Sequence, residues 1–450
     1  MENTIIVGAG LVGSLLSVYL ARAGFKVSVY DRNSDPRQLN LQLGRSINIT
    51  LSERGLQALD AVGVRDTVHK FCIPVYGRII HSQDGELTYQ PYGNNKEAIY
   101  SIGRDDLTKQ LVSFAEKHEN IEFHFHEKCS DIDLATATLK LQNVETRKIS
   151  EVQADRIFGA DGAFSVVRGK MQRLKRFNYS QEYSNQGYKE IIVPPDKDNW
   201  ALDKNAIHIW PRGTFMLIGF PNLDKSFTLS LQLPYQGQIS HESIRSPEDL
   251  QNIFETYFPD AWSLVEPNCT DYFNKPVEAM ITIKCFPWTY EDKVALIGDS
   301  CHAIFPSYGQ GANAGFEDCQ VLMKCFEKQP KDWRKIFQEY ETLRKPHLDA
   351  IADLCFEHFT ELRKMVGDFK FLLRKKIERK LHQIDPNFAP LYYNISFTCM
   401  PYAEAREIEE KHQEIINKLL EIDSIEDRIE NFHLVPELSG QHLSENLQPI

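Results

Sequence analysis

The amino-acid sequence predicts an α/β protein in which a Rossmann-like dinucleotide-binding domain is combined with a second β-sheet and C-terminal helices. The first observation is a glycine-rich turn, GAGLVG at residues 8–13, between a short apolar strand and a helical pattern. The second is a pair of later strands that end in Gly-Ala-Asp-Gly (159–162) and Gly-Asp (298–299). The third is a run of short strands with proline and glycine turns over residues 187–233. Together they predict a helix-covered parallel sheet beside an antiparallel one.

Composition narrows the class of protein. A chain of 450 residues is long enough for two or three structural units. Its net charge of −12 argues against a nucleic-acid partner, which requires clustered lysines and arginines. Nine scattered cysteines without CxxC or metal-ligand spacing indicate reduced thiols and no metal site. No apolar run is long enough for a spanning helix, so we expect a soluble, cytoplasmic protein without a membrane anchor.

The first βαβ unit runs from Thr4 to Arg32. Its glycines have separate roles: Gly8 permits the tight turn, Gly10 lets the backbone approach a pyrophosphate, and Gly13 lets the helix pack on the strand. The second strand ends at Asp31, which is placed to accept a hydrogen bond from a ribose hydroxyl. The predicted cofactor residues here are Gly8, Gly10, Leu11, Val12, Gly13, Asp31 and Arg32.

The segment after this unit reads as a polar loop over residues 32–43 that ends in GRSIN (44–48). Arg45 in that motif could bridge a phosphate or cover the cofactor, or it could be a solvated loop arginine. Ser52 is a candidate N-cap for a helix over residues 53–62.

Two strands, over residues 76–81 and 87–92, place Arg78 between apolar neighbours. A helix is then predicted to run to about residue 118, with Arg104 just before it, where its side chain can point back toward the first unit. Strands are predicted over 121–125 and 138–144. The GADG strand that follows leads directly into a helix, so its loop with Asp161 can face a cofactor from the other side; an ordinary β-turn is the alternative.

The middle of the chain is predicted to form the second sheet, from the segments YKEIIV, AIHIWP, TFMLIGF and SFTLSLQLP. This sheet could cover a pocket. A helix over residues 247–258 and a strand over 277–286 follow.

The segment 293–313 contains a buried strand, Gly298-Asp299 and a glycine-punctuated loop before a helix that begins near Ala312. Asp299 would accept hydrogen bonds from a polyol, and the helix end would favour negative charge. His302 could be proposed as a base, although a loop histidine is the simpler interpretation because no nucleophile accompanies it. Helices are predicted over 314–382, broken at Pro330 and Pro346, and over 403–431, before a polar tail.

Taken together, GxGxxG, GADG and GDSCH with GQG resemble the FAD-dependent aromatic hydroxylases, the single-component flavoprotein monooxygenases. A closer likeness to one group within them rests on GRSIN, PYG (91–93), GYKE (187–190), HIWPRG (208–213), FPNLD (220–224) and SFT (226–228). The resemblance implies bound FAD, NADPH as a transient reductant, and dioxygen. It also implies a flavin C4a-hydroperoxide that hydroxylates an aromatic amino acid bearing a ring amino group.

The resemblance also assigns residues. Arg45 and Arg104 match flavin-contacting arginines, and Asp299 matches a ribityl-binding aspartate. Arg78, Tyr92 and Tyr392 match the group that holds the substrate carboxylate. The family pattern further implies that Asp161, Gly311, Ala312 and Asn313 face the cofactor, and that Pro306, Gly309 and Gln310 position the reacting groups, with no catalytic side chain assigned.

The chain departs from the family pattern in the ring-facing pocket, at Gln232, Ser307, Tyr308, Ala312 and His358. These departures leave the substrate's ring open. The substrate could be the usual one of this group, another aromatic amino acid or an indole-derived acid. A second alternative is a flavin- or NAD-binding reductase or binding module without oxygen transfer, which GADG and GDSCH disfavour.

The resemblance implies the aromatic hydroxylase fold with a discontinuous domain division. The FAD-binding domain would comprise residues 1–75, 100–180 and 285–330, and the substrate-binding sheet residues 76–99 and 181–284. The C-terminal helical region would be 331–450.

Overall fold

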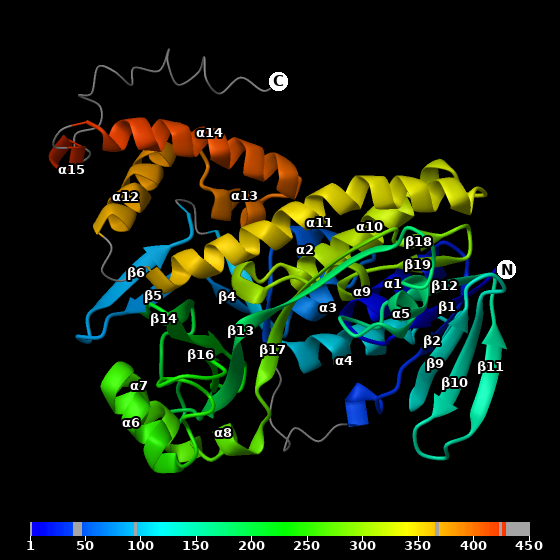
Figure 1. Ribbon diagram of the computed structural model, residues 1–450, viewed down its shortest axis with the longest axis horizontal. Helices are drawn as coiled ribbons and strands as arrows, with labels where there is room; N and C mark the ends of the chain where they lie inside the picture. Colours follow the sequence, from blue (N-terminus) through cyan, green and yellow to red (C-terminus); the bar gives the residue numbers. More distant parts are fainter. Residues whose placement is uncertain (1, 39–46, 94–96, 365–368, 423–424, 429–450) are drawn as a thin grey trace.

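The computed structural model describes residues 2–38, 47–93, 97–364, 369–422 and 425–428. In Figure 1 the parallel sheet with its helices lies on the right, and a seven-stranded sheet lies at the lower left. The long helix α11 (Trp333–Lys364) crosses between these two parts, and the last helices lie above it.

The parallel sheet is built on β1 (Asn3–Val7), whose last four residues are buried, as in strands that are covered on both faces. Val7 pairs with Gly159, and Gly159 pairs with Leu296, so the three glycine-containing turns begin at the same edge of the sheet. We call this the carboxyl edge. The strand order is β18 (Thr289–Tyr290), β19 (Val294–Leu296), β12 (Arg156–Gly159), β1, β2 (Lys26–Tyr30) and β8 (Ile121–His124), with only β18 antiparallel to its neighbour.

Helices cover this sheet and its edge. The helix α1 (Leu11–Arg22) is buried along most of its length and packs against α4 (Arg104–Ala115) and α10 (Gly311–Lys328). The other helices of this part are short: α2 (Glu53–Ala61), α3 (Arg65–His69), α5 (Val166–Met171) and α9 (Asp299–His302). The predicted N-cap Ser52 does precede α2, but its side chain does not cap that helix.

Two small sheets flank the parallel one. The first has the order β3 (Asn48–Leu51), β7 (Ile99–Gly103) and β4 (Ile73–Val75). The second is an antiparallel meander of β9 (Glu127–Asp133), β10 (Thr138–Asn143) and β11 (Ile149–Gln153), of which the sequence predicts only β10. Since β9 and β11 expose most of their residues, their polar composition hides the alternation that indicates a strand.

The seven-stranded sheet has the order β17 (Glu278–Phe286), β13 (Asn178–Val193), β16 (Phe227–Pro234), β15 (Phe215–Pro221), β14 (Ala206–Arg212), β5 (Gly77–His81) and β6 (Leu87–Pro91). The four predicted strands are present and antiparallel to one another. The strand β5, which comes from an earlier part of the chain, pairs with β14 in the parallel direction. The helices α6 (Pro247–Tyr257), α7 (Pro259–Val265) and α8 (Asp271–Asn274) follow β16.

The predicted break at Pro346 is wrong, because α11 continues through it as one helix. Proline removes one helical hydrogen bond, and here the packing of α11 on α10 and α14 (Tyr402–Leu420) holds the helix together across that gap. The predicted break at Pro330 is confirmed, since α10 ends before it and α11 begins after it. The remaining helices are α12 (Phe369–Ile384), α13 (Leu391–Phe397) and α15 (Ile425–Arg428).

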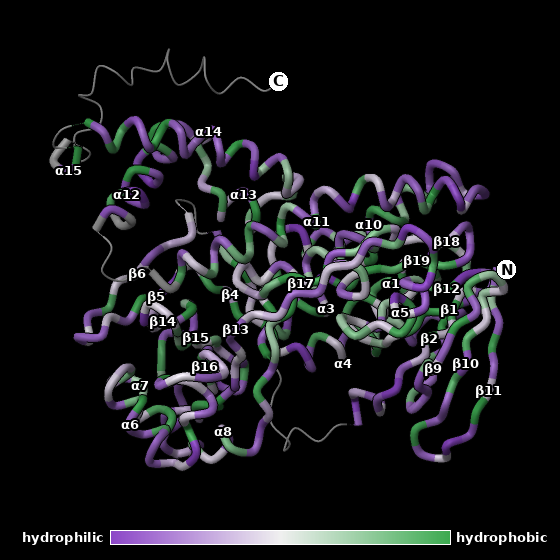
Figure 2. The backbone as a smooth tube through the Cα atoms, viewed as in Figure 1, coloured by the Kyte–Doolittle hydropathy of each residue, from purple (hydrophilic) through white to green (hydrophobic). Residues whose placement is uncertain are grey.

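Hydropathy follows this arrangement. Figure 2 shows the helices α12 and α14 alternating between hydrophilic and hydrophobic residues. The strand β1 and the inner helix α1 are buried over most of their lengths. Among the described residues, no helix has both the length and the apolar composition needed to cross a membrane. The division of the chain into three domains stays a prediction.

Candidate active site

A cavity of about 340 Å³ lies between the carboxyl edge of the parallel sheet and the seven-stranded sheet. We call it the main cavity. Residues from at least six separate segments line it, so the fold gathers groups that are far apart in the sequence. The predicted site residues that line it are Gly10, Leu11, Val12, Arg78, Tyr92, Arg104, Gln232, Asp299, Pro306, Ser307, Tyr308, Gly309, Gly311, Ala312 and Tyr392.

The glycine-rich turn can accept a pyrophosphate. A Cβ on Gly8 would lie 2.5 Å from the carbonyl oxygen of Ala160, and one on Gly13 would lie 1.9 Å from that of Gly8, so both glycines are required by close backbone packing. Gly10 has no atom within 4 Å of its Cβ position, and it faces the main cavity. Gly10 is also the N-cap of α1 and gives no side-chain cap, which leaves the helix N–H groups open to an anion. These features fit the phosphates of a dinucleotide.

Asp31 lies beside this turn but does not line the main cavity. One oxygen of its carboxylate, Oδ2, accepts a hydrogen bond from the Ala9 N–H at 2.7 Å, and Oδ1 accepts one from the Asn33 N–H at 2.8 Å. The carboxylate keeps lone pairs for a ribose hydroxyl, because each oxygen can accept more than one bond. Arg32 follows as an exposed residue outside the cavity lining.

The GADG turn faces the cavity with its backbone, whereas its carboxylate points elsewhere. Asp161 Oδ2 accepts hydrogen bonds from the N–H groups of Val166, at 2.7 Å, and Val167, at 3.3 Å, at the start of α5. Ala160, Gly162 and Ala163 line the main cavity instead. Burial raises the pKa of Asp161. The geometry thus favours a capping role for this side chain over a direct contact with a ligand.

The third turn brings a helix end to the cavity. Asp299 is exposed at the first position of α9 and lines the main cavity. Gly309 has a φ of +65°, and a Cβ there would lie 2.1 Å from the Thr50 hydroxyl oxygen, so this loop can only approach β3 with glycine. Gly311 and Ala312 then open α10 at the cavity wall without a side-chain cap. The N-terminus of α10 therefore lies at the cavity wall, where its partial positive charge would favour an anionic group.

Asn313 and Gln310 hold this loop in place and lie outside the cavity lining. Asn313 Nδ2 donates to the carbonyl oxygens of Thr50, at 2.8 Å, and Gly309, at 2.9 Å, while its Oδ1 accepts from the Ser52 N–H at 2.9 Å. Gln310 Oε1 accepts a hydrogen bond from the Tyr402 hydroxyl at 2.9 Å. Both amides brace the loop against its neighbours.

Of the two arginines predicted to contact the flavin, Arg104 is the first residue of α4 and lines the main cavity with an exposed side chain. Arg45 lies outside the described residues.

The opposite end of the main cavity holds a buried cation. Arg78 is 9% exposed, and its guanidinium lies 4.3 Å from the centre of the Tyr392 ring and 5.4 Å from that of Tyr92. Among the described residues no carboxylate forms an ion pair with it. The Tyr92 hydroxyl is buried and has no hydrogen-bond partner among them either. Burial raises the pKa of Tyr92, so this phenol stays a hydrogen-bond donor. A buried cation beside an unused donor fits an anionic ligand group.

Four residues form a wall between the main cavity and a second cavity of about 200 Å³: Arg78, Tyr92, Tyr308 and Tyr392. His358 lines the second cavity and stacks on Tyr308 at 4.1 Å between ring centres. Both of its ring nitrogens are buried; Nδ1 lies 3.7 Å from Glu361 Oε2, and burial outweighs this carboxylate and lowers the pKa of His358 to about 4. His358 is therefore neutral and separated from the main cavity by Tyr308.

Two further residues at which the chain departs from the family pattern differ in orientation. The Ser307 hydroxyl donates to the carbonyl oxygen of Cys355 at 2.5 Å, which fixes the loop to α11. Gln232 lines the main cavity, and its Oε1 is buried without a partner among the described residues. Gln232 thus offers a free acceptor to a ligand, whereas Ser307 uses its hydroxyl within the protein.

The sequence did not single out the apolar wall of the main cavity, because its residues look like ordinary core positions. They come from β14, β15 and α11: Ile207, Ile209, Met216, Ile218, Phe220, Phe359 and Leu362. Their alternation along β14 and β15 could have indicated that one face of the sheet looks into a pocket. This wall gives the main cavity an apolar side.

Three of the family-like motifs meet in space. Asn48, the last residue of GRSIN, donates from Nδ2 to Asn222 Oδ1 at 3.0 Å and to the Pro221 carbonyl oxygen at 3.2 Å, both in FPNLD. Asn222 in turn donates to the hydroxyl oxygens of Ser226 and Thr228 in SFT, each at 3.0 Å. The motifs therefore form one buried polar bridge between β3 and the seven-stranded sheet.

Comparison with known proteins identifies the class. The family model described as FAD binding domain matches residues 1–354, and the chain belongs to the FAD-dependent aromatic hydroxylases. The predictions of the fold class and of FAD as the cofactor are thereby confirmed.

The particular family follows from two curated relatives. The kynurenine 3-monooxygenase of Flavobacterium johnsoniae is 48% identical over 440 residues, which is 97% of this chain and 97% of that protein. The kynurenine 3-monooxygenase of Christiangramia forsetii is 44% identical over 432 residues, 96% of each chain. Within the aromatic hydroxylases, the chain belongs to the kynurenine 3-monooxygenase family.

A solved structure supports the fold alone. The tetrameric form of 2-methyl-3-hydroxypyridine-5-carboxylic acid oxygenase superposes with a TM-score of 0.67 at 21% identity, covering 82% of this chain and 94% of that chain.

Proposed function

We propose that the protein is a monooxygenase that uses FAD, NADPH and dioxygen to hydroxylate L-kynurenine to 3-hydroxykynurenine. The observation that carries this proposal is the buried guanidinium of Arg78 at the end of an apolar cavity, which forms no ion pair with any described residue. A buried cation without a counter-charge is costly, and an amino-acid carboxylate would balance it through charge-assisted hydrogen bonds. The two relatives named kynurenine 3-monooxygenase support L-kynurenine as the aromatic substrate.

The residues of the main cavity would divide the work. Gly10 and the start of α1 would hold the pyrophosphate, while Asp299 and the start of α10 would hold the part of FAD that lies deeper. Bound FAD supplies the activation of dioxygen and the transfer of one oxygen atom. NADPH would be a transient reductant, because the described residues contain one glycine-rich βαβ unit.

The substrate would lie between the two ends. Arg78, Tyr92 and Tyr392 would hold the carboxylate, and the apolar wall of β14 and β15 would cover the ring and exclude water. Exclusion of water favours transfer of oxygen to the ring over release of hydrogen peroxide. The aniline-type ring is already electron-rich, so the proposal needs no side-chain base.

A second candidate keeps the chemistry and changes the ring. The free amide oxygen of Gln232 in the main cavity would accept a hydrogen bond from another ring substituent or from an indole N–H. The substrate would then be another aromatic amino acid or an indole-derived acid.

The test is a panel assay with FAD-loaded protein and NADPH. L-Kynurenine, kynuramine, which lacks the carboxylate, and other aromatic amino acids are compared by NADPH consumption, hydrogen peroxide release and product mass. We expect hydroxylated product from L-kynurenine and little from kynuramine. If L-kynurenine accelerates NADPH oxidation and yields only hydrogen peroxide, it is an effector and the proposal is wrong; hydroxylation of another compound instead would support the second candidate.

The role of Arg78 is tested with Arg78→Met. We expect the preference for the carboxylated compound to disappear while bound FAD is kept. Loss of FAD would instead assign Arg78 to the cofactor. Arg212→Met is the matched control, since Arg212 is a half-buried arginine of the same sheet that donates to the His81 carbonyl oxygen and lies outside the main cavity.

A further inference from the structure

The helix α10 touches both glycine turns of the cofactor site at one buried junction. A Cβ on Gly315 would lie 2.5 Å from Val12 Cγ2 and 3.6 Å from the Cα of Gly298, so α10 lies directly against the two turns. A Cβ on Gly298 would itself lie 3.0 Å from Val12 Cγ2. Val12 and Asp299, next to Gly298, both line the main cavity. The position of α10 therefore sets the separation of the two turns.

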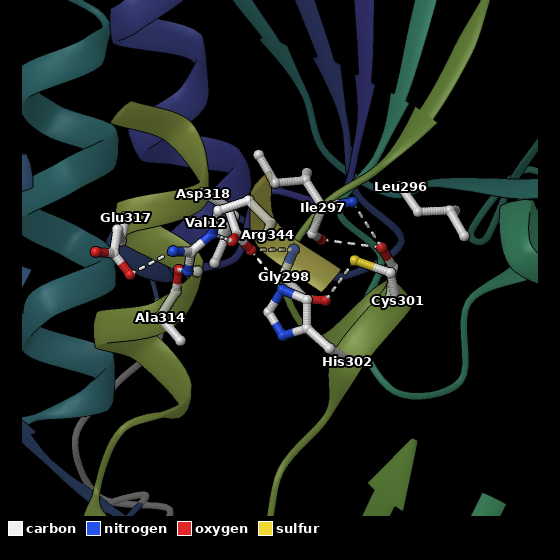
Figure 3. Close-up of polar contacts among 12 residues, drawn as sticks. Val12, Leu296, Ile297, Gly298, Cys301, His302, Ala314, Glu317, Asp318 and Arg344 are labelled. Carbon is white, nitrogen blue, oxygen red and sulfur yellow. Dashed lines mark hydrogen bonds and ion pairs between the residues drawn. The ribbon is translucent and has the colours of Figure 1, made fainter. Parts of the chain in front are cut away.

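One carboxylate fastens this junction. Asp318, one turn after Gly315 and fully buried, accepts hydrogen bonds from the Gly298 N–H at 3.2 Å and from His302 Nε2 at 2.5 Å through Oδ2. Its Oδ1 accepts from Arg344 Nε at 2.7 Å. Figure 3 shows Asp318 between His302 on one side and Arg344 on the other. Asp318 of α10 therefore holds the start of α9 through the Gly298 N–H and the end of α9 through His302. Its bond to Arg344 connects the same carboxylate to α11.

The charges around Asp318 are balanced. Arg344 also contacts Glu317, at 2.6 Å, and Glu317 contacts Arg54 at 2.5 Å, which gives two carboxylates and two guanidinium groups in one buried network. Burial raises the pKa of Asp318, but the neighbouring His302 and Arg344 outweigh it and hold that pKa below its ordinary value. Asp318 is therefore a carboxylate, and it accepts all three hydrogen bonds.

We propose that Asp318 is a positioning residue for the cofactor, which fixes the Gly298–Asp299 turn relative to the Val12 turn without touching the cofactor itself. The proposal rests on the FAD-binding part of the proposed function. It explains why a buried carboxylate in α10 reaches back to a backbone N–H in the turn that lines the main cavity.

Asp318→Asn is the most direct variant. An amide has one acceptor oxygen, whereas three donors surround Asp318, so the new NH₂ group must face either Arg344 or the Gly298 N–H. The Gly298 N–H can only donate, so it cannot pair with an NH₂ group. In either orientation Arg344 loses the negative charge beside it. We expect the Gly298–Asp299 turn to shift while the side-chain volume stays nearly the same.

The measurements are the dissociation constant of FAD, the visible absorption spectrum of the bound flavin, and the melting temperature of the protein without FAD. For Asp318→Asn we expect the dissociation constant to rise at least about tenfold, the cost of one unsatisfied buried donor, with an altered flavin spectrum. Glu341→Gln is the matched control, because Glu341 is also a buried carboxylate that accepts a backbone N–H, that of Trp288, away from the main cavity. Its affinity for FAD should stay within about twofold of the wild type.

A pair of variants at His302 covers the case in which Asp318→Asn does not fold. His302→Gln can still donate a hydrogen bond to Asp318, and it should keep most of the FAD affinity and the wild-type spectrum. His302→Leu cannot donate, and it should weaken FAD binding and alter the spectrum.

The proposal would be overturned if Asp318→Asn and Glu341→Gln lost FAD affinity to the same extent, with each loss following the drop in melting temperature. It would also be overturned if the two His302 variants bound FAD equally well. A wild-type protein that binds FAD and hydroxylates nothing would contradict the proposed function only.

Discussion

Glu190 shows how one buried residue makes stability depend on pH. It lies on β13, and burial raises its pKa from 4.5 to about 7. Between these two values the folded protein keeps a proton that the unfolded chain has lost, so the free energy of unfolding falls as the pH rises through this window. The loss is at most about 3 kcal/mol by proton linkage.

The variant Glu190→Gln removes this titration. We expect it to raise the free energy of unfolding relative to the wild type at pH 8 and to change it little at pH 5, measured by urea denaturation. Glu182→Gln, at an exposed position of the same strand, is the control and should behave like the wild type at both values. An equal effect of Glu190→Gln at pH 5 and pH 8 would contradict the expectation.

Tyr92 has a buried hydroxyl without a hydrogen-bond partner among the described residues. The variant Tyr92→Phe removes one donor to the proposed carboxylate, and we expect KM for L-kynurenine to rise about fivefold, equivalent to about 1 kcal/mol, with kcat nearly unchanged. Steady-state kinetics measure this split. The control is Tyr89→Phe, at an exposed tyrosine of β6, the strand that ends just before Tyr92. A change in kcat alone would indicate that the hydroxyl acts on the reaction instead of on binding.

At the scale of elements, local sequence patterns predict strands well where apolar residues are buried and turn residues mark the ends of the strand. The continuous apolar run of β1 and the proline- and glycine-bounded strands β13 to β16 were found in this way. The patterns fail where tertiary packing overrides them, as in β9 and β11, whose polar residues pair with β10, and in α11 at Pro346.

The helix α11 gives a prediction of its own. Pro346→Ala restores an N–H that can bond to the preceding turn, so we expect the free energy of unfolding to rise by about 1 kcal/mol, after the greater flexibility of the unfolded chain is deducted. Chemical denaturation measures the change. Pro330→Ala is the control, because Pro330 lies between α10 and α11, and its replacement should leave stability unchanged or slightly lower. A less stable Pro346→Ala protein would show that the proline is needed for the course of α11.

At the scale of the whole molecule, a buried polar bridge joins the small sheet that contains β3 to the seven-stranded sheet. Asn48 and Asn222 connect β3, next to the glycine turns, with the turn between β15 and β16. Asn48 lines the main cavity, and its bond to Asn222 fixes how the seven-stranded sheet covers that cavity.

A double-mutant cycle of Asn48→Ala and Asn222→Ala tests this bridge. We expect a coupling energy of about 1–2 kcal/mol in the free energy of unfolding, since either single variant already removes the bond between the two amides. The control pair Asn222→Ala and Asn143→Ala joins residues of different sheets that share no hydrogen bond, and should show additive effects. Additivity in the Asn48 and Asn222 pair would mean that the sheets are held by other contacts.

The sequence by itself determined the fold class and the dinucleotide turn. It could do so because GxGxxG, GADG and GDSCH are local: each needs only a strand, a tight turn and a helix start. Tertiary structure alone decided that Asp161 caps α5, that His358 lies behind Tyr308, and that Asp318 holds the Gly298 turn. These outcomes depend on contacts between segments that no spacing in the sequence encodes, because a buried carboxylate or imidazole takes the partners that the packed helices bring to it.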